Sequence, residues 1–139
     1  MKVLLDTCII SDIYRAHKAK ILQAALKSIG EENCFVSVVT LGEITNGIHL
    51  LDESKKKRDL LGWIESFEKQ YNDRVIIIDV PTAKTWGELT AKCKRKGKVI
   101  SAADGLIAAS AITHGLHVMT GNIKDFEPTG AMVVNPYVH

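Results

Sequence analysis

Cysteine is scarce in this sequence, and its placement argues against two classes of small protein. Three cysteines, Cys8, Cys34 and Cys93, occur among 139 residues, and none belongs to a C-x-x-C pair. An odd and widely spaced set is not typical of a disulfide framework, and it lacks the ligand spacing of a structural zinc site. The cysteine content therefore favours a reducing compartment, and we expect a cytoplasmic protein.

Long apolar runs are also missing. The chain begins Met-Lys-Val-Leu-Leu-Asp, so a charge follows after only three apolar residues. No other segment approaches the roughly 20 consecutive apolar residues that a membrane-spanning helix needs. We therefore expect neither a signal peptide nor a membrane partner. The sequence also contains no P-loop and no G-x-G-x-x-G motif, so it carries no signal for those forms of nucleotide binding.

Neither sign of charge dominates the composition. The chain has 18 lysine and arginine residues and 16 aspartate and glutamate residues, for a net charge of +2. This balance permits a nucleic-acid partner but does not require one. Apolar residues make up 46% and charged residues 24%, which is typical of an ordinary globular protein. Because no linker or low-complexity segment interrupts the chain, residues 1–139 are predicted to form a single domain.

Short apolar segments alternate with helical patterns along the whole chain. The segments predicted to be strands are Val3–Leu5, Cys34–Ser37, Val75–Ile78, His117–Thr120 and Ala131–Val134. The predicted helices run from Cys8 to Ser28 with a break near His17, from Thr40 to Leu51, from Lys55 to Tyr71, from Pro81 to Lys96 and from Ser101 to His114. Apolar strands that alternate with helices are typical of a parallel sheet covered on both faces. We therefore predict a three-layer α/β/α sandwich around a parallel sheet of about five strands.

Three carboxylates stand alone in apolar sequence. Asp6, Glu43 and Asp104 are the only formal charges within residues 3–11, 33–51 and 99–123, respectively. A buried carboxylate without a partner costs several kcal/mol, so it must be protonated, paired or bound to a metal ion. Oxygen ligands without histidine or cysteine favour Mg²⁺ or Mn²⁺ over zinc. We predict one shared cation site, which Asp125 completes, although Asp125 by itself is typical of a solvated loop acid.

Local structural roles could explain several of these acids separately. The segments Thr40-x-x-Glu43 and Ser101-x-x-Asp104 both match a capping box, in which the acid reaches back to the start of its helix. Asp6 could cap the helix that follows it. The case for a metal site therefore depends on the acids as a set, because each of them alone has a structural explanation.

Five segments of the chain resemble the PIN domains, and within them the VapC-type toxins of bacterial and archaeal toxin–antitoxin pairs. They are Leu-Leu-Asp-Thr-Cys-Ile-Ile-Ser (4–11), Ser-Val-Val-Thr-Leu-Gly-Glu-Ile-Thr-Asn-Gly (37–47), Ala-Ala-Asp-Gly-Leu-Ile-Ala-Ala-Ser-Ala (102–111), Thr-Gly-Asn-Ile-Lys-Asp-Phe (120–126) and Val-Val-Asn-Pro-Tyr (133–137). Each segment alone is a moderately specific signal, and their order and spacing together are a strong one. The resemblance spans the whole chain.

The resemblance implies a nuclease. Members of this family have an acidic quartet that binds Mg²⁺ or Mn²⁺ and cleaves RNA. The positions that match this quartet are Asp6, Glu43, Asp104 and Asp125. Thr120 and Asn122 match polar residues that often support the quartet, as a second shell. At Gly121 the chain departs from many relatives, which carry a basic residue there. The resemblance also implies a cognate antitoxin protein and a homodimer.

The chemistry of phosphodiester cleavage suggests a role for each acid. One or two Mg²⁺ ions can lower the pKa of bound water and stabilise the leaving oxygen. Mg²⁺ uses few carboxylates together with waters and substrate phosphates. We therefore expect Asp6 and Asp104 to be the primary ligands, Glu43 to be a ligand or a base that orients water, and Asp125 to be an outer ligand.

Two other functions remain open from the sequence. A phospho-receiver domain for signalling would use Asp79, which ends a buried strand, as the phosphoacceptor, although a helix cap before Pro81 is the favoured role for this residue. Such a domain would leave Glu43 and Asp104 unexplained. A non-catalytic PIN-like module that only binds RNA is the second alternative, and the complete quartet argues against it.

Overall fold

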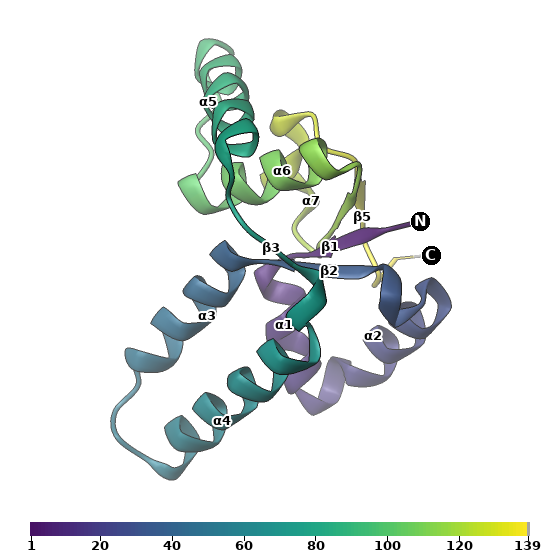
Figure 1. Ribbon diagram of the computed structural model, residues 1–139, viewed down its shortest axis with the longest axis vertical. Helices are drawn as coiled ribbons and strands as arrows, with labels where there is room; N and C mark the ends of the chain where they lie inside the picture. Colours follow the sequence, from purple (N-terminus) through teal and green to yellow (C-terminus); the bar gives the residue numbers. More distant parts are fainter. Residues whose placement is uncertain (139) are drawn as a thin grey trace.

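A parallel sheet of five strands forms the centre of the molecule (Figure 1). The computed structural model describes residues 1–138, and at positions 16 and 17 it describes the backbone only. The strands are β1 (Val3–Leu5), β2 (Cys34–Ser37), β3 (Val75–Ile76), β4 (His117–Met119) and β5 (Val133–Val134). They lie in the order β3-β2-β1-β4-β5, and all four neighbouring pairs are parallel. The predicted parallel sheet is confirmed.

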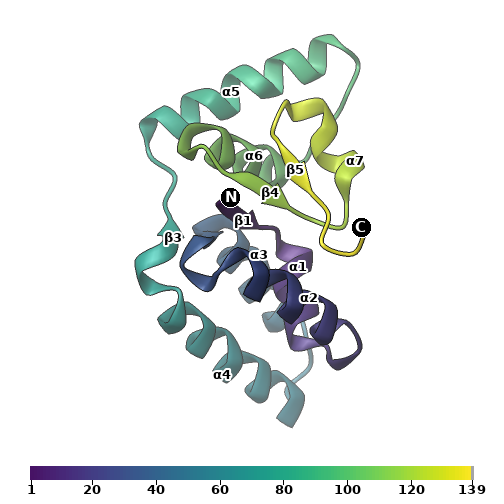
Figure 2. The same cartoon turned by 90° about the vertical axis from the view of Figure 1, so that its right-hand side faces the viewer.

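Helices cover both faces of this sheet. They are α1 (Thr7–Tyr14), α2 (Ala16–Ile29), α3 (Val38–His49), α4 (Lys55–Gln70), α5 (Val80–Arg95), α6 (Ala102–His114) and α7 (Ile123–Phe126), with short 3₁₀ turns at Glu31–Asn33, Asn72–Arg74 and Glu127–Thr129. Figures 1 and 2 both show α1 to α4 on one side of the sheet and α5 to α7 on the other. The predicted three-layer α/β/α arrangement is therefore confirmed.

The two faces of the sheet supply two separate apolar cores. Side chains of a strand point alternately to opposite faces. In β1, Val3 and Leu5 pack into the core that α1 to α4 cover, whereas Leu4 packs into the core under α5 to α7. All three are 0% exposed. This double burial explains why the strands read as unbroken apolar runs in the sequence.

The first helical segment is interrupted, as predicted. Helix α1 ends at Tyr14, and Arg15 is extended with ψ of 123° before α2 begins at Ala16. The break lies two residues before the predicted position at His17. The break ends α1 after about two turns. Helix α1 is therefore a short helix that begins two residues after the end of β1.

The start of α3 differs from the prediction and changes the interpretation of Glu43. The helix begins at Val38, because the Ser37 hydroxyl at the end of β2 accepts a hydrogen bond from the Val39 N–H at 3.1 Å. Thr40 is therefore inside the helix, and the predicted capping box of Thr40 and Glu43 is wrong. Glu43 lies in the second turn of α3 rather than the first, so capping does not explain it.

Two further boundaries are corrected by the structure. Strand β3 ends at Ile76 instead of Ile78, and Asp79 follows as the cap of α5, with its Oδ1 accepting a hydrogen bond from the Thr82 N–H at 3.0 Å. The cap that the sequence favours for Asp79 is thus confirmed. Asp125, predicted in a loop, belongs to the single-turn helix α7.

The three cysteines are all free, as expected for a chain without a disulfide framework. Among the helices of residues 1–138, none combines the length and the apolar character that crossing a membrane requires.

Candidate functional site

The order of the strands defines where a ligand site is expected. From β1 the chain adds β2 and β3 on one side of the sheet and then returns to add β4 and β5 on the other. In open parallel sheets, ligands bind beyond the carboxyl ends of the strands at such a switch point. Asp6 directly follows β1 and Thr120 directly follows β4, so both residues lie at the switch point.

Asp6 is a buried carboxylate whose two oxygens are both held in place. It is only 5% exposed. Its Oδ1 accepts a hydrogen bond from the Thr7 N–H at 2.8 Å and so caps α1. Its Oδ2 accepts a hydrogen bond from the Thr120 hydroxyl at 2.8 Å, across the junction of β1 and β4. The capping role is confirmed, but it leaves lone pairs on both oxygens for a further ligand.

Cys8 contributes a third neutral group to this carboxylate. Its Sγ lies 3.4 Å from Oδ2 of Asp6 and 3.6 Å from the Thr120 hydroxyl oxygen. Burial raises the pKa of the Cys8 thiol, and the negative charge of Asp6 adds to the rise. The thiol therefore stays protonated at neutral pH and donates to Asp6. A thiol held in this state is a poor nucleophile.

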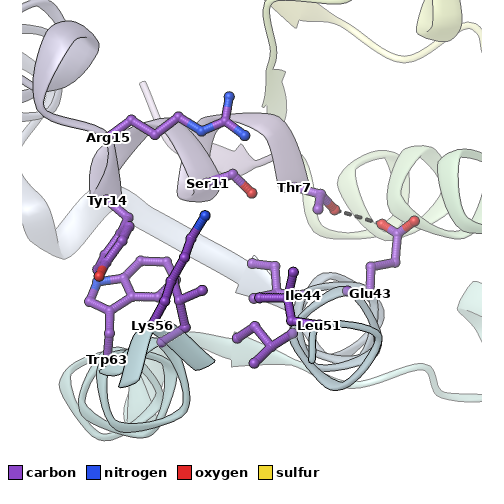
Figure 3. Close-up of a pocket in the computed structure, with 12 residues that line it drawn as sticks. Thr7, Ser11, Tyr14, Arg15, Glu43, Ile44, Leu51, Lys56 and Trp63 are labelled. Carbon is purple, nitrogen blue, oxygen red and sulfur yellow. Dashed lines mark hydrogen bonds between the residues drawn. The ribbon is translucent and has the colours of Figure 1, made fainter. Parts of the chain in front are cut away.

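Glu43 approaches the switch point from α3. The Thr7 hydroxyl donates a hydrogen bond to Oε1 of Glu43 at 2.6 Å (Figure 3). Thr7 is the first residue of α1, directly after Asp6, so this contact ties Glu43 to the helix that Asp6 caps. The role of Thr7 was not predicted from the sequence. Its only signal there is its position next to Asp6.

Asp104 lies in the first turn of α6, and the charges of the other three acids act on it. The Ser101 hydroxyl accepts a hydrogen bond from the Asp104 N–H at 3.1 Å, which confirms the Ser101 half of the predicted capping box. Burial raises the pKa of Asp104, and the charges of Asp6, Asp125 and Glu43 add to the rise. The structure therefore brings the side chains of all four acids into one electrostatic field.

The segment after β4 positions Asp125 and Asn122. Phe126, 0% exposed, anchors α7 in the core and thereby fixes the exposed Asp125 next to it. The Asn122 backbone N–H donates a hydrogen bond to the Thr120 hydroxyl at 2.9 Å, while its side chain does not cap α7. The supporting role that the resemblance gives to the Asn122 side chain stays a prediction.

The charge of these four acids is not compensated within the part of the chain that the structure describes. No lysine, arginine or histidine there forms a salt bridge with any of them. The groups that donate hydrogen bonds to Asp6 and Glu43 are neutral. Across residues 1–138, no three His, Cys, Asp or Glu side chains are arranged to hold a metal ion by themselves. The region thus holds carboxylates whose charge no described cation compensates, and their side chains alone do not form a metal site.

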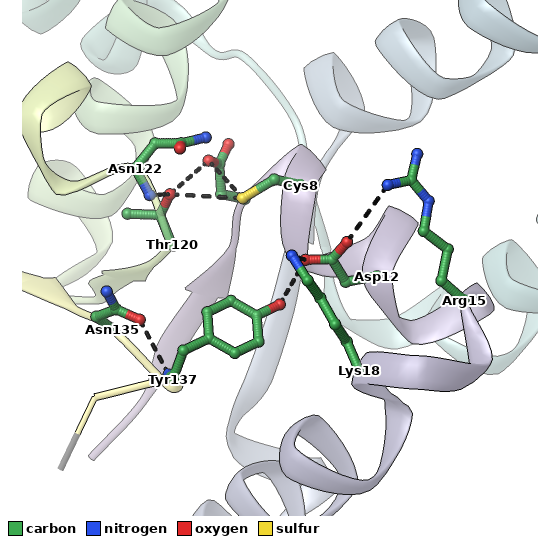
Figure 4. Close-up of polar contacts among 9 residues, drawn as sticks. Cys8, Asp12, Arg15, Lys18, Thr120, Asn122, Asn135 and Tyr137 are labelled. Carbon is green, nitrogen blue, oxygen red and sulfur yellow. Dashed lines mark hydrogen bonds and ion pairs between the residues drawn. The ribbon is translucent and has the colours of Figure 1, made fainter.

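The C-terminal segment is tied to α1 beside this cluster (Figure 4). The Tyr137 hydroxyl donates a hydrogen bond to Oδ2 of Asp12 at 2.6 Å, and Lys18 pairs with the same oxygen at 3.4 Å. A Cβ atom at Gly121 would lie 3.2 Å from the Tyr137 ring. The ring therefore takes the space beside position 121, which gives a physical reason for glycine there.

Replacing Gly121 by alanine is expected to lower the free energy of unfolding by about 1 kcal/mol, the lower end of the cost of overpacking. The physical reason is the 3.2 Å approach of the new Cβ to Tyr137. In a Tyr137→Ala background the same change should become neutral or stabilise the protein by up to ~1 kcal/mol, because it then only restricts the unfolded chain. Urea denaturation of the four proteins measures this coupling. If Gly121→Ala lowered the free energy of unfolding equally in both backgrounds, the contact between position 121 and the Tyr137 ring would be contradicted.

The chain is similar to known proteins over nearly its whole length. The model of the PIN domain family matches residues 3–129. Toxin FitB of Neisseria gonorrhoeae is 35% identical over 136 residues, which cover 97% of this chain and 98% of FitB. VapC ribonuclease Y4jK of Sinorhizobium fredii is 29% identical, with 97% of each chain covered.

Solved structures give the same result. The crystal structure of FitAcB from Neisseria gonorrhoeae contains a chain that superimposes with a TM-score of 0.90 at 34% identity, over 99% of both chains. A chain of VapBC2 from Rickettsia felis, bound to a DNA fragment from its promoter, gives a TM-score of 0.82 at 26% identity, over 97% of this chain and 98% of that one. The predicted family is confirmed: the chain belongs to the PIN-domain family, and its relatives there include VapC ribonucleases and the toxin FitB.

Proposed function

We propose that this protein is a metal-dependent endoribonuclease and the toxin of a toxin–antitoxin pair. The observation that carries the proposal is the cluster of four carboxylates without a compensating cation at the switch point of the sheet. Relatives named as VapC ribonucleases support RNA as the substrate. The net charge of +2 would not by itself have selected this substrate.

The donor set fits Mg²⁺ or Mn²⁺. The four acids offer hard oxygen ligands, which Mg²⁺ and Mn²⁺ prefer over softer ones. Open positions are expected for Mg²⁺, which keeps several waters and takes few protein ligands. Asp6 and Asp104 would hold the ion, and Asp125 would act as an outer ligand. A bound ion would supply activation of water and neutralisation of the phosphate charge.

The chain's own residues have separable tasks in this proposal. Thr120 holds Oδ2 of Asp6, so the carboxylate keeps one orientation at the end of β1. Thr7 occupies only Oε1 of Glu43 and leaves Oε2 able to orient a water or accept its proton. The Cys8 thiol stays neutral and donates to Asp6, so no residue here acts as a covalent nucleophile.

A cognate antitoxin is part of the same proposal. Matching chains come from assemblies such as FitAB bound to DNA, and another comes from a structure described as a toxin–antitoxin complex from Klebsiella pneumoniae. A cytoplasmic nuclease would need such a restraint until it is released. The homodimer and the cytoplasmic location expected from the sequence stay predictions.

The phospho-receiver alternative does not fit the topology. Its phosphoacceptor, Asp79, follows the edge strand β3, two strands away from β1 and three from β4. Asp79 is exposed, and its carboxylate is engaged in capping α5. It therefore lies away from Asp6 and Thr120, with which a receiver site would have to combine it.

Cleavage of single-stranded RNA by the purified protein tests the proposal directly. We expect cleavage with Mg²⁺ or Mn²⁺, its complete loss in excess EDTA, and its return when the metal ion is added back in excess. The binding-only alternative predicts RNA retention without cleavage under every condition. Activity that persists in excess EDTA would contradict the metal mechanism.

A further inference from the structure

A cavity of about 490 Å³ lies beside the acidic cluster, between α1, α3 and α4 (Figure 3). Thr7 and Glu43 line one end of this cavity, which we call the side pocket. The same two residues are hydrogen-bonded at the edge of the acidic cluster. Ile44 and Leu51 supply apolar lining. The side pocket therefore meets the acidic cluster at the end that Thr7 and Glu43 line.

Aromatic rings form the far wall of the side pocket. Tyr14 of α1 and Trp63 of α4 lie with ring centroids 4.9 Å apart and planes tilted by 54°. Trp63 is backed by the core and by Phe67, at 5.9 Å between centroids, whereas Tyr14 is 44% exposed. Rings of this kind, fixed on one side and open on the other, are surfaces on which single-stranded bases stack.

Two cations stand at the rim of the side pocket. Arg15 and Lys56 both line it and are labelled in Figure 3. The Arg15 side chain is 63% exposed, and its nearest carboxylate, Asp12, lies 3.9 Å away and already pairs with Tyr137. In the described chain no salt bridge involves Lys56. Both charges are thus available to a ligand.

We propose that the side pocket binds one nucleotide of single-stranded RNA, next to the phosphate that is cut. Its base would lie against Tyr14 and Trp63, and its phosphates would contact Arg15 and Lys56. This inference rests on the proposed ribonuclease function. Four clustered carboxylates repel the phosphates of the RNA backbone, so a ribonuclease with this site needs positive charge nearby to bind its substrate. Cations beside the cluster supply the missing attraction and fix the strand.

The chemistry of the pocket favours a nucleotide over a segment of a protein partner. An apolar helix would cover the apolar lining but would offer no counter-charge to Arg15 and Lys56. Phosphates pair with both cations while the base covers the aromatic wall. The volume of about 490 Å³ also lies within the range of small-ligand sites, roughly 300–1,000 Å³.

Cleavage kinetics of a short oligoribonucleotide with one cut site test this assignment. Tyr14→Ala is expected to raise KM about 5- to 10-fold and to weaken the dependence of kcat/KM on the base flanking the cut, since stacking of one base is lost. Arg15→Gln and Lys56→Gln should each raise KM. Each should also reduce the slope of log KM against log salt by about 0.7, the contribution of one phosphate contact to a single strand.

Matched variants separate the side pocket from general effects. Lys55→Gln removes the same charge one residue earlier on α4, where Lys55 pairs with Asp59 at 3.5 Å. Ile21→Ala truncates a side chain as exposed as Tyr14, at 48%, on α2. Both should keep the wild-type KM, salt slope and base preference.

The outcomes are distinguishable from failure of the proposed function. If the wild-type protein cleaves no RNA, the ribonuclease function fails. If it cleaves RNA but Tyr14→Ala, Arg15→Gln and Lys56→Gln keep its KM, salt slope and base preference, only the nucleotide pocket is overturned. Weaker binding of a co-expressed antitoxin by these variants, with unchanged cleavage, would assign the pocket to the protein partner instead.

Discussion

Asp6→Asn and Asp104→Asn are each expected to reduce Mg²⁺-dependent RNA cleavage by roughly 10²–10³-fold or more. Each change removes a charge that would hold the ion, and metal-ion catalysis contributes several kcal/mol, with about 1.4 kcal/mol for each factor of ten. Asparagine keeps the shape of the side chain, and at position 6 it can still cap α1. The loss should therefore appear in single-turnover cleavage rates and in Mn²⁺ binding by calorimetry, while the fold is retained.

Asp79→Asn is the matched control for these variants. It makes the same change at the cap of α5, away from the acidic cluster, and asparagine caps helices as well as aspartate does. Its cleavage rate and stability should equal those of the wild type. Near-wild-type cleavage by Asp6→Asn, or an equal loss in Asp79→Asn, would contradict the assignment of the site.

Stability provides a second readout for Asp104→Asn that does not depend on activity. The pKa of Asp104 is raised by burial and by the neighbouring acids, so its ionised form disfavours the folded state. The variant should melt about 2–5 °C higher than the wild type at pH 7 without metal, a shift that corresponds to ~1 kcal/mol in a domain of this size. The gain should disappear as the pH falls below about 4, where the carboxyl is protonated in both states.

Removing the hydroxyl of Thr120 is expected to weaken both the site and the fold. In Thr120→Val, Oδ2 of Asp6 loses its donor at 2.8 Å, and the Asn122 N–H loses its acceptor at 2.9 Å. Groups that orient a metal ligand are typically worth 10–100-fold in metal affinity or activity. A buried polar group left without its partner costs about 1–3 kcal/mol. Mg²⁺ titration of the cleavage rate and urea denaturation measure the two effects.

Thr120→Ser isolates the hydroxyl from the shape of the side chain. Serine keeps the oxygen that bonds to Asp6, so its Mg²⁺ dependence should stay close to that of the wild type. Valine keeps the volume and the β-branch but not the oxygen. If Thr120→Val and Thr120→Ser had the same Mg²⁺ dependence, the hydrogen bond from Thr120 to Asp6 would not explain the role of Thr120.

Contacts between residues close in the sequence could be predicted well. The cap of α6 joins the Ser101 hydroxyl to the Asp104 N–H, three residues apart, as the serine of the predicted capping box requires. The same rule failed at Thr40 and Glu43, because Ser37, a second capping residue three positions earlier, begins the helix instead. Ser37 is the last residue of β2 and is paired in register with Ile76 of β3. Strand pairing therefore fixes where β2 ends, and so which of the two possible caps, Ser37 or Thr40, begins α3.

Contacts between distant residues gave no signal in local patterns, and only the resemblance pointed to a supporting role for Thr120. Thr120 and Asp6 are 114 positions apart, Thr7 and Glu43 are 36 apart, and Tyr137 and Asp12 are 125 apart. Nothing in the composition or periodicity of a segment specifies the side chain that reaches it from another strand or helix. For the same reason the side pocket, whose walls come from three helices, could not be predicted.

The sequence by itself determined the α/β class, the parallel sheet and the isolated acids Asp6, Glu43 and Asp104, because burial on both faces and the cost of an unpaired charge both restrict residue types locally. Tertiary structure alone decided the strand order, and with it the meeting of β1 and β4 that places Thr120 on Asp6. It also decided that the uncompensated charge has an aromatic and cationic pocket beside it. Long-range contacts of this kind arise only when the chain closes on itself, so they depend on geometry that no local pattern contains.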